Sequence, residues 1–239
     1  MTSYSASAAY GRVDVAAAER LIVVGAGGFG REVVEWISQA WPECRERVAG
    51  FLAADTGRVE TALGSLPILG DPSDFIPRER DRLVLAIGIP VVRRTVAESL
   101  MSRRARFATL VHPAAIVAST AIVGEGSVVC PFAVLSDSSQ LGRHVLVNYH
   151  SSLGHDARVG DFSVLSPYAT MGGHAIAADD VFLGMHAVVG PRRQIGSRSK
   201  ISAGSCALHD VSPDSLVFGV PGRTARLVEP GIAIGESTA

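Results

Sequence analysis

The segment VNYHSSLGHDARVGDFSVL (residues 147–165) places a large aliphatic residue at every sixth position, beginning with Val147 and ending with Leu165. The spacing continues in both directions, so one unbroken apolar series runs through this half of the chain. Its members are Val117, Val123, Val129, Leu135, Leu141, Val147, Leu153, Val159, Leu165, Met171, Ala177, Leu183, Val189, Ile195 and Ile201. The residue after each member is small or turn-forming, as Gly154 and Gly160 illustrate.

This six-residue period indicates a parallel β-helix. A period of six matches neither an α-helix nor a single β-strand, whereas each unit of a β-helix contains one short strand and one corner. We expect the aliphatic residues to fill the interior and the small ones to occupy corners, where glycine adopts positive φ at little cost. Three units close one triangular coil, so residues three units apart should stack about 4.8 Å from one another.

The composition is that of a folded protein and argues against two classes of partner. The chain has 239 residues, 47% of them hydrophobic and 19% charged, with a net charge of −1. A chain so nearly neutral has no bulk electrostatic attraction for nucleic acid or an acidic membrane, and we expect neither partner. The length allows two modest domains.

The cysteines and the N-terminal segment favour a cytoplasmic protein. Cys44, Cys130 and Cys206 are far apart and form neither a CxxC pair nor a zinc-finger spacing, which suits a reducing compartment. No apolar run reaches membrane-spanning length. The first twenty residues are rich in Ala and Ser and lack the apolar core of a signal peptide, so we predict a flexible tail there.

Alternating strand and helix patterns precede the β-helix and predict a small Rossmann-like α/β domain with a parallel sheet. The predicted strands are residues 21–24, 48–52, 66–69 and 83–87, and the predicted helices are residues 31–41 and 90–101. The period changes to six between residues 107 and 116. We therefore divide the chain into a tail at 1–20, an α/β domain at 21–106, a β-helix domain at 107–210 and a mostly irregular tail at 211–239.

A glycine-rich turn, Gly25-Ala-Gly-Gly-Phe-Gly30, connects the first predicted strand to the first predicted helix. Gly25, Gly27 and Gly30 have the GxGxxG spacing that lets a backbone approach a phosphate at a helix N-terminus. The alternative is that the glycines serve only a tight turn. The acid expected after the second strand comes late, at Asp55, and the strands are too few for a complete dinucleotide fold. We interpret the unit as a half-site for one nucleotide or nucleotide sugar, not for NAD.

The middle coils of the β-helix contain the candidate for a catalytic base. In the predicted stacking, His155 shares a column with Asp137 and Gly173, and Asp156 lies directly below His174. A histidine beside a carboxylate is a plausible general base, because the carboxylate sets the tautomer and stabilises the imidazolium. Either aspartate could fill that role. Gly173 leaves space beside the imidazole and a backbone N–H free to face a ligand, whereas a lone surface histidine is more often inert.

A zinc site is the rival interpretation of the same histidines. His150 and His155 have the spacing of two zinc ligands in the parallel β-helix carbonic anhydrases, which take a third histidine from two coils earlier. Here those positions are Ala114 and Ser119, which cannot supply it. Zinc enzymes need three protein ligands and one open position, and we therefore predict no metal.

The chain resembles the NeuD/PglD-type sugar O- and N-acetyltransferases, which are hexapeptide-repeat acyltransferases with an N-terminal Rossmann-like domain. The resemblance covers nearly the whole chain after the tail. It rests on the following motifs: Val24-Gly-Ala-Gly-Gly-Phe-Gly-Arg31, Ala86-Ile-Gly88 with Arg93, Val147-Asn148, Gly154-His-Asp156 with Val159-Gly-Asp161, Phe182-Leu-Gly184 and Phe218-Gly-Val-Pro-Gly222.

The resemblance implies a left-handed β-helix and a homotrimer that binds acetyl-CoA in the groove between neighbouring β-helices. It implies transfer of an acetyl group to an amine or hydroxyl of a nucleotide-linked sugar. His155 would be the general base, Asp156 would raise its basicity, and the Gly173 N–H would contact the thioester carbonyl. The residues implied for acetyl-CoA are Gly173, Met185 and Ala203, and those for the acceptor are Gly25, Gly27, Gly28, Phe29, Gly30, Asp55 and Gly88.

Three departures from the family pattern leave the acceptor open. Phe29 replaces a frequent histidine, Ala53-Ala54 stands where acids often contact the nucleotide sugar, and Val164 replaces a second histidine. The chemistry assigned to His155 survives all three. An O-acetyltransferase acting on a free sugar, a sialic acid or a non-sugar acceptor is therefore an alternative. A carbonic-anhydrase-like zinc enzyme and a non-catalytic binding protein are alternatives of other classes.

Overall fold

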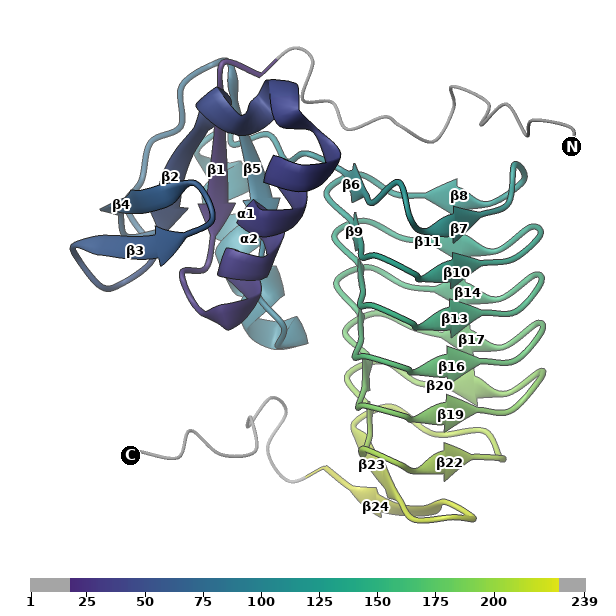
Figure 1. The fold of residues 1–239 in the computed structure, drawn as a ribbon. Helices are drawn as coiled ribbons and strands as arrows, with labels where there is room; N and C mark the ends of the chain where they lie inside the picture. The colour runs from purple at the N-terminus through teal and green to yellow at the C-terminus, as the bar shows by residue number, and fades with distance from the viewer. Residues whose placement is uncertain (1–17, 228–239) are drawn as a thin grey trace, which may run out of the picture.

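The computed structural model describes residues 18–227, so the predicted N-terminal tail lies almost wholly outside the described residues, as does the chain after residue 227. Figure 1 shows an α/β unit beside a long column of stacked coils, the predicted left-handed parallel β-helix. Within residues 18–227, no helix combines the length and the apolar character needed to cross a membrane.

The α/β unit contains one five-stranded sheet with the order β3-β4-β2-β1-β5. Its elements are β1 (Arg20–Val24), α1 (Gly28–Ala40), a 3₁₀-helix (Pro42–Arg47), β2 (Val48–Leu52), β3 (Arg58–Thr61), β4 (Gly64–Gly70), β5 (Asp81–Leu85) and α2 (Pro90–Ser102). The prediction of an entirely parallel sheet is wrong at one edge, because β3 and β4 form an antiparallel hairpin. The short, largely exposed β3 has no apolar run that marks it as a strand.

The β-helix follows the predicted register. Its strands are β6 (Leu110–Val111), β7 (Ile116–Val117), β8 (Ile122–Val123), β9 (Val128–Val129), β10 (Val134–Leu135), β11 (Gln140–Leu141), β12 (Leu146–Val147), β13 (Ser152–Leu153), β14 (Arg158–Val159), β15 (Val164–Leu165), β16 (Thr170–Met171), β17 (Ile176–Ala177), β18 (Phe182–Leu183), β19 (Val188–Val189), β20 (Gln194–Ile195), β21 (Lys200–Ile201) and β22 (Cys206–Ala207). Each residue of the apolar series is the second residue of a strand. Parallel partners lie eighteen positions apart, as Val147 pairs with Leu165.

The strands form three sheets that define the faces of the prism. We call the sheet on which the α/β unit packs the docked sheet, and it contains β6, β9, β12, β15, β18 and β21. The second sheet contains β7, β10, β13, β16, β19 and β22, and the third sheet contains β8, β11, β14, β17 and β20. The docked sheet continues into β23 (Ser215–Phe218) and β24 (Arg223–Arg226), so the prediction of a mostly irregular segment after residue 210 is wrong there.

The corners are built differently from the prediction. Positive φ occurs three residues after every inward aliphatic residue from Val123 to Ile201, mostly at residues other than glycine such as Asp156 (φ 58) and His174 (φ 58), whereas the glycines next to the aliphatic residues do not adopt it. With the exception of Gly190, those glycines are required by packing. A Cβ on Gly154 would lie 2.6 Å from the backbone nitrogen of Gly173 in the next coil. Close stacking of the coils therefore selects glycine there.

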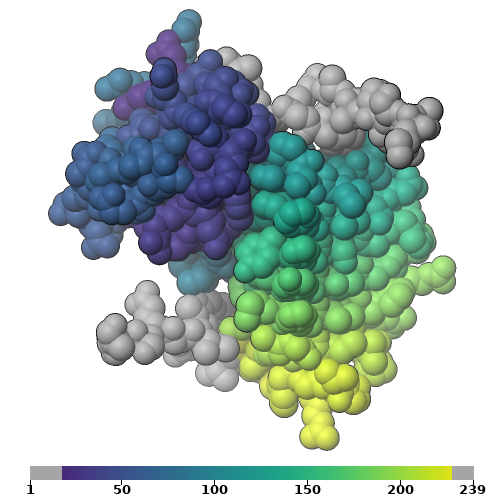
Figure 2. All heavy atoms as spheres, in the orientation of Figure 1, coloured from purple at the N-terminus to yellow at the C-terminus, as the bar shows by residue number. Residues whose placement is uncertain are grey.

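The α/β unit packs on the docked sheet near the first coils (Figures 1 and 2). Val128, Leu146 and Val164 of that sheet belong to one buried cluster with Val33 of α1. The linker joins both parts, because Phe107 bridges to β5 and Leu110 pairs with Val128. The two parts thus share a core as well as a connection.

Arg93 of α2 is completely buried at this junction. Its Nε donates to the carbonyl of His144 in the β-helix (2.6 Å), and its Nη1 donates to the carbonyls of Leu85 (2.8 Å) and Ile87 (2.9 Å). Burial lowers the pKa of Arg93 to about 9, which leaves the guanidinium charged at neutral pH. One side chain therefore ties helix α2 and the end of β5 to a β-helix corner.

His144 is buried beside this contact and provides a test of the packing by pH. Its ring stacks on Phe162 (4.9 Å between ring centroids) and meets the edge of Phe107 (4.8 Å). Burial, with the nearby charge of Arg93, lowers the pKa of His144 to about 4. The unfolded chain takes up this proton near pH 6.5, so stability is full above that pH and falls as the pH drops toward 4.

We expect the folded state to lose about 2 kcal/mol of stability through His144 between pH 7.5 and pH 5. His144→Phe should remove that part of the pH dependence, as measured by urea unfolding at the two values. His209→Phe, which replaces an exposed histidine, is the control. An unchanged pH dependence in His144→Phe would show that the histidine is not held neutral.

Candidate functional site

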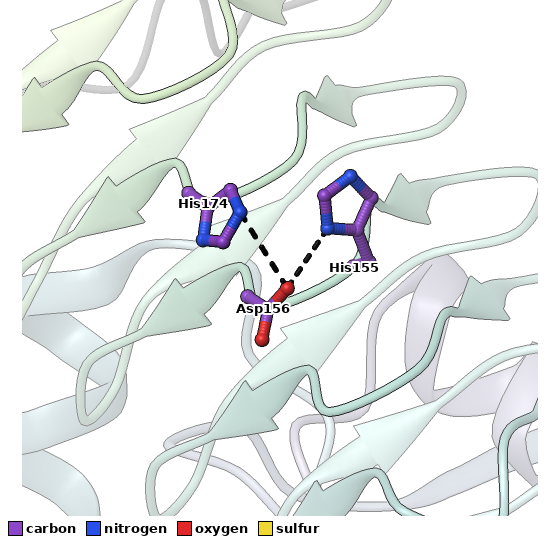
Figure 3. A group of neighbouring side chains, drawn as sticks. All are labelled: His155, Asp156 and His174. Carbon is purple, nitrogen blue, oxygen red and sulfur yellow. Dashed lines mark hydrogen bonds and ion pairs between the residues drawn. The ribbon is translucent and has the colours of Figure 1, made fainter.

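His155 and Asp156 lie together in the exposed turn between β13 and β14 (Figure 3). His155 Nδ1 is 2.8 Å from Asp156 Oδ2. The hydrogen bond with His155, followed by the nearby imidazole of His174, lowers the pKa of Asp156, so this side chain is an ionised acceptor at neutral pH. Because a carboxylate only accepts, Nδ1 of a neutral His155 carries the proton and Nε2 has the free lone pair.

The free nitrogen of His155 faces the space beside Gly173. A Cβ placed on Gly173 would lie 2.5 Å from His155 Nε2, so a larger residue would occupy the approach to this nitrogen. Within residues 18–227, the Gly173 N–H makes no hydrogen bond. The free lone pair of His155 Nε2 and the N–H of Gly173 thus belong to neighbouring groups at this corner.

Asp137, the other aspartate considered for orienting the base, is engaged elsewhere. It accepts hydrogen bonds from Thr120 Oγ1 (2.5 Å) and Ser138 Oγ (3.3 Å). Asp156 is the carboxylate that contacts the imidazole of His155. The sequence placed both beside the histidine, and only the side-chain geometry distinguishes them.

Gly173→Ala tests this arrangement. We expect the methyl group to displace the His155 ring and to lower kcat/KM for acetyl transfer by about 10–100-fold, because small misplacements of a catalytic group cost about that much. The free energy of unfolding should change little, since the site is on the surface. Gly190→Ala is a matched control, because its Cβ would have no neighbour closer than 3.4 Å. Full activity of Gly173→Ala would contradict the assignment.

His150 and His155, the histidines of the alternative zinc site, do not lie together. His150 lies in the turn between β12 and β13, at a different corner from His155, and stacks between Phe132 (5.1 Å) and Tyr168 (4.9 Å). Within residues 18–227, the histidine, cysteine and carboxylate side chains close enough to share a metal ion are His155, Asp156 and His174. His150 is therefore not beside His155, and the histidine that does lie beside it is His174.

The glycines of the first turn divide into two groups. Gly25 adopts φ +110, and a Cβ on it would lie 2.7 Å from the Ala86 carbonyl oxygen. A Cβ on Gly30 would collide with the Gly25 carbonyl. These two are required by the strand–helix turn itself. Gly27 and Gly28 have no atom within 4 Å of a Cβ position and leave open space that a ligand could fill.

A cavity of about 1080 Å³ lies between the start of α2 and the docked sheet. It unites four predicted site residues, Phe29 and Gly88 from the α/β unit with Met185 and Ala203 from the β-helix. The other predicted acceptor residues, Gly25, Gly27, Gly28, Gly30 and Asp55, are not in its lining. Charged residues that sequence reasoning did not assign also line it, namely Glu32, Arg94, Asp180, Arg198 and Lys200.

Ion pairs position several of these charged side chains. Arg94 of α2 binds Asp180 of the β-helix at 2.8 Å and lies 4.3 Å above the ring of Phe162. Arg198 binds Asp214 at 2.6 Å. Arg94 and Asp180 are far apart in sequence, and only the packing of α2 on the docked sheet brings them together.

His155 and Asp156 do not reach this cavity within one chain. Their turn joins the second and third sheets, whereas the cavity lies over the docked sheet. Figure 1 shows that the turn after β13 is on the side of the β-helix away from the α/β unit. One chain therefore carries the predicted base at one corner of the β-helix and the cavity on the opposite face.

Residues 20–100 match the family model of the PglD N-terminal domain. A GDP-perosamine N-acetyltransferase from Escherichia coli O157:H7 is 26% identical over 135 residues, which are 56% of this chain and 61% of that protein. The matched part thus spans less than two thirds of the relative's length.

Solved structures match over more of the chain. The acetyltransferase domain of PglB from Neisseria gonorrhoeae FA1090, in complex with acetyl coenzyme A, is 27% identical with a TM-score of 0.76, covering 87% of this chain and 100% of that one. A perosamine N-acetyltransferase variant from Caulobacter crescentus, in complex with CoA and GDP-perosamine, is 25% identical with a TM-score of 0.77, covering 86% and 96%. With a match to the PglD N-terminal domain followed by a left-handed β-helix, the chain is similar in both parts to the NeuD/PglD-type sugar acetyltransferases.

Proposed function

We propose that this protein transfers an acetyl group from acetyl-CoA to an amine or hydroxyl of a nucleotide-linked sugar. The observation that carries the proposal is the pair of His155 and Asp156, with Nε2 of the histidine facing the space at Gly173. The relatives named for GDP-perosamine N-acetylation and the structures bound to CoA support the donor and favour an amine on the acceptor. The free cysteines and this donor suit a cytoplasmic enzyme.

In the proposed reaction, His155 acts as general base. Its Nε2 takes a proton from the acceptor amine or hydroxyl as that atom attacks the thioester carbonyl carbon. The charge that develops on the carbonyl oxygen is stabilised by the Gly173 N–H. The carbon–sulfur bond then breaks, and the imidazolium returns the proton to the leaving thiolate. Asp156 stabilises the imidazolium throughout.

The cavity is the proposed binding site for both substrates. Its volume is slightly above the usual range of about 300–1,000 Å³ for small-molecule sites, which suits a donor with a long pantetheine arm. We assign Met185 and Ala203 to the donor, and Phe29 and Gly88 to the acceptor. The α/β domain (residues 21–106) would then select the acceptor, and the β-helix domain (residues 107–210) would hold the donor and supply the base.

We propose that the active site forms between subunits of a homotrimer. His155 and the cavity lie on different sides of one chain, so a proton acceptor must come from a neighbouring copy. In a closed ring, each subunit can present its His155 corner to the cavity of the next subunit, so that every cavity receives a base from its neighbour.

Mixed oligomers test this arrangement. His155→Ala and Gly88→Leu should each be inactive, the second because its side chain enters the cavity through open space. Coexpression of the two variants should restore about a quarter of the wild-type sites. About half of the subunits have an intact corner and the other half an intact cavity, so random mixing joins an intact corner to an intact cavity at about one interface in four. Activity that stays at the level of the separate variants would show that each site belongs to one chain.

The reaction itself is tested by thiol release from acetyl-CoA. The acceptors are nucleotide-linked 4-amino sugars, free sugars, sialic acids and amino acids, each with a no-acceptor control. We expect rapid release with a nucleotide-linked amino sugar. Release with free sugars alone would replace the proposed acceptor by a free sugar. Binding of acetyl-CoA without release on any acceptor would favour a non-catalytic binding protein.

A further inference from the structure

His155, Asp156 and His174 form a compact cluster that the proposed reaction uses only in part. Asp156 Oδ2 lies 2.8 Å from His155 Nδ1 and 3.7 Å from His174 Nε2 (Figure 3). One ligand atom from each of the three residues lies within 4.8 Å of the other two. All three side chains are exposed in the single chain, and in the proposed trimer they face the cavity that the substrates enter from solution, so an ion can reach them.

The cluster is held by the β-helix and not by a loose loop. His155 and Asp156 occupy one corner, and His174 occupies the corner of the next coil directly above. The His174 backbone N–H donates to the His155 carbonyl (2.9 Å), and the Asp156 N–H donates to the Asp137 carbonyl (2.9 Å). The two rings meet edge to face, with centroids 5.0 Å apart. The backbone that carries the three ligands is therefore ordered before any ion arrives, and the His155–Asp156 contact already brings two of the ligand atoms together, which reduces the ordering cost of binding.

Two imidazoles and one carboxylate are a typical ligand set for zinc in an open site. We propose that His155 Nδ1, Asp156 Oδ2 and His174 Nε2 bind Zn²⁺ reversibly, and that bound Zn²⁺ switches off the acetyl transfer. Three protein ligands leave a further position for water. The binding itself does not depend on the proposed function, but the inhibition rests on it.

The inhibition follows from the two nitrogens of one ring. In the metal-free chain, Nδ1 of neutral His155 donates its proton to Asp156, and Nε2 is free to accept one. When Zn²⁺ takes the Nδ1 lone pair, the proton of the neutral ring moves to Nε2 through solvent. The nitrogen that faces Gly173 then has no lone pair to receive the acceptor's proton. Asp156 is also turned from the imidazole to the metal ion.

Calorimetric titration of the full-length, untagged and chelator-treated protein with ZnCl₂ tests the site. We expect one Zn²⁺ per chain. His174→Ala should weaken binding by at least about tenfold, because even groups that only support metal ligands are worth 10–100-fold. His186→Ala, which replaces an exposed histidine in another turn, is the matched control and should bind as the parent does.

Thiol release measured over the same Zn²⁺ range tests the inhibition. Loss of turnover should follow the binding curve and be reversed by EDTA, and His174→Ala, compared with its own metal-free rate, should need at least about tenfold more Zn²⁺. Absence of binding, or equal affinity in His174→Ala, would overturn the site and leave the proposed function intact. Binding without loss of turnover would overturn the switch. If the chelator-treated protein binds Zn²⁺ but shows no turnover before Zn²⁺ is added, the proposed function is contradicted and the metal site is not.

Discussion

His155→Ala is expected to lower kcat/KM for acetyl transfer by about 10²–10⁴-fold, the usual contribution of a positioned general base. The variant loses the imidazole nitrogen that lies next to the open space at Gly173. The side chain is exposed and packs into no core, so the fold and the affinity for acetyl-CoA should persist. Thiol release at saturating acceptor and calorimetric binding of CoA measure the two effects separately.

Asp156→Asn should retain the contact geometry but lose the charge that stabilises the imidazolium, and we expect a smaller loss than for His155→Ala. His186→Ala is the control for removal of an exposed histidine from the β-helix surface. Near-wild-type turnover in His155→Ala would refute the proposed mechanism while leaving the fold as described.

Arg93→Leu is expected to lower the free energy of unfolding by about 3–5 kcal/mol. The substitution leaves the carbonyls of Leu85, Ile87 and His144 without this donor in a buried junction, and each unsatisfied polar group costs about 1–3 kcal/mol. It also separates α2 from the β-helix, so the cavity between them should widen and acceptor binding should weaken. Urea unfolding followed by circular dichroism gives the stability.

Arg93→Lys should be intermediate, because an ammonium replaces some of these hydrogen bonds but lacks the guanidinium geometry. Arg80→Leu, which removes an exposed ion pair with Glu19, is the matched control and should change stability by less than about 1 kcal/mol. A comparably small effect of Arg93→Leu would show that the junction does not depend on this side chain.

Much of the fold could be predicted because the β-helix is specified locally. Each inward position must be filled within its own six-residue unit, so the series from Val117 to Ile201 marks a strand at every step. The same periodicity determined that Asp156 would lie below His174 and that Gly173 would lie beside His155. The turn from β1 to α1 was equally local, because Gly25 and Gly30 are required by contacts within that unit.

The rest depended on contacts between distant segments. The hairpin of β3 and β4 forms by pairing at a sheet edge. The charged and exposed residues of β3 give no sequence signal of that pairing. The pairing of Arg94 with Asp180 exists only because α2 packs on the docked sheet.

The sequence by itself determined the β-helix, the glycine turn and the placing of His155 beside Gly173, because neighbouring residues or a strict repeat impose each of them. Only the tertiary structure decided that His155 and the cavity lie on different sides of one chain, and that His174 shares the carboxylate of Asp156. The physical reason is that a repeat defines the order of residues along each column. The face on which the α/β unit packs, and the direction of each exposed side chain, depend on contacts that no repeat contains.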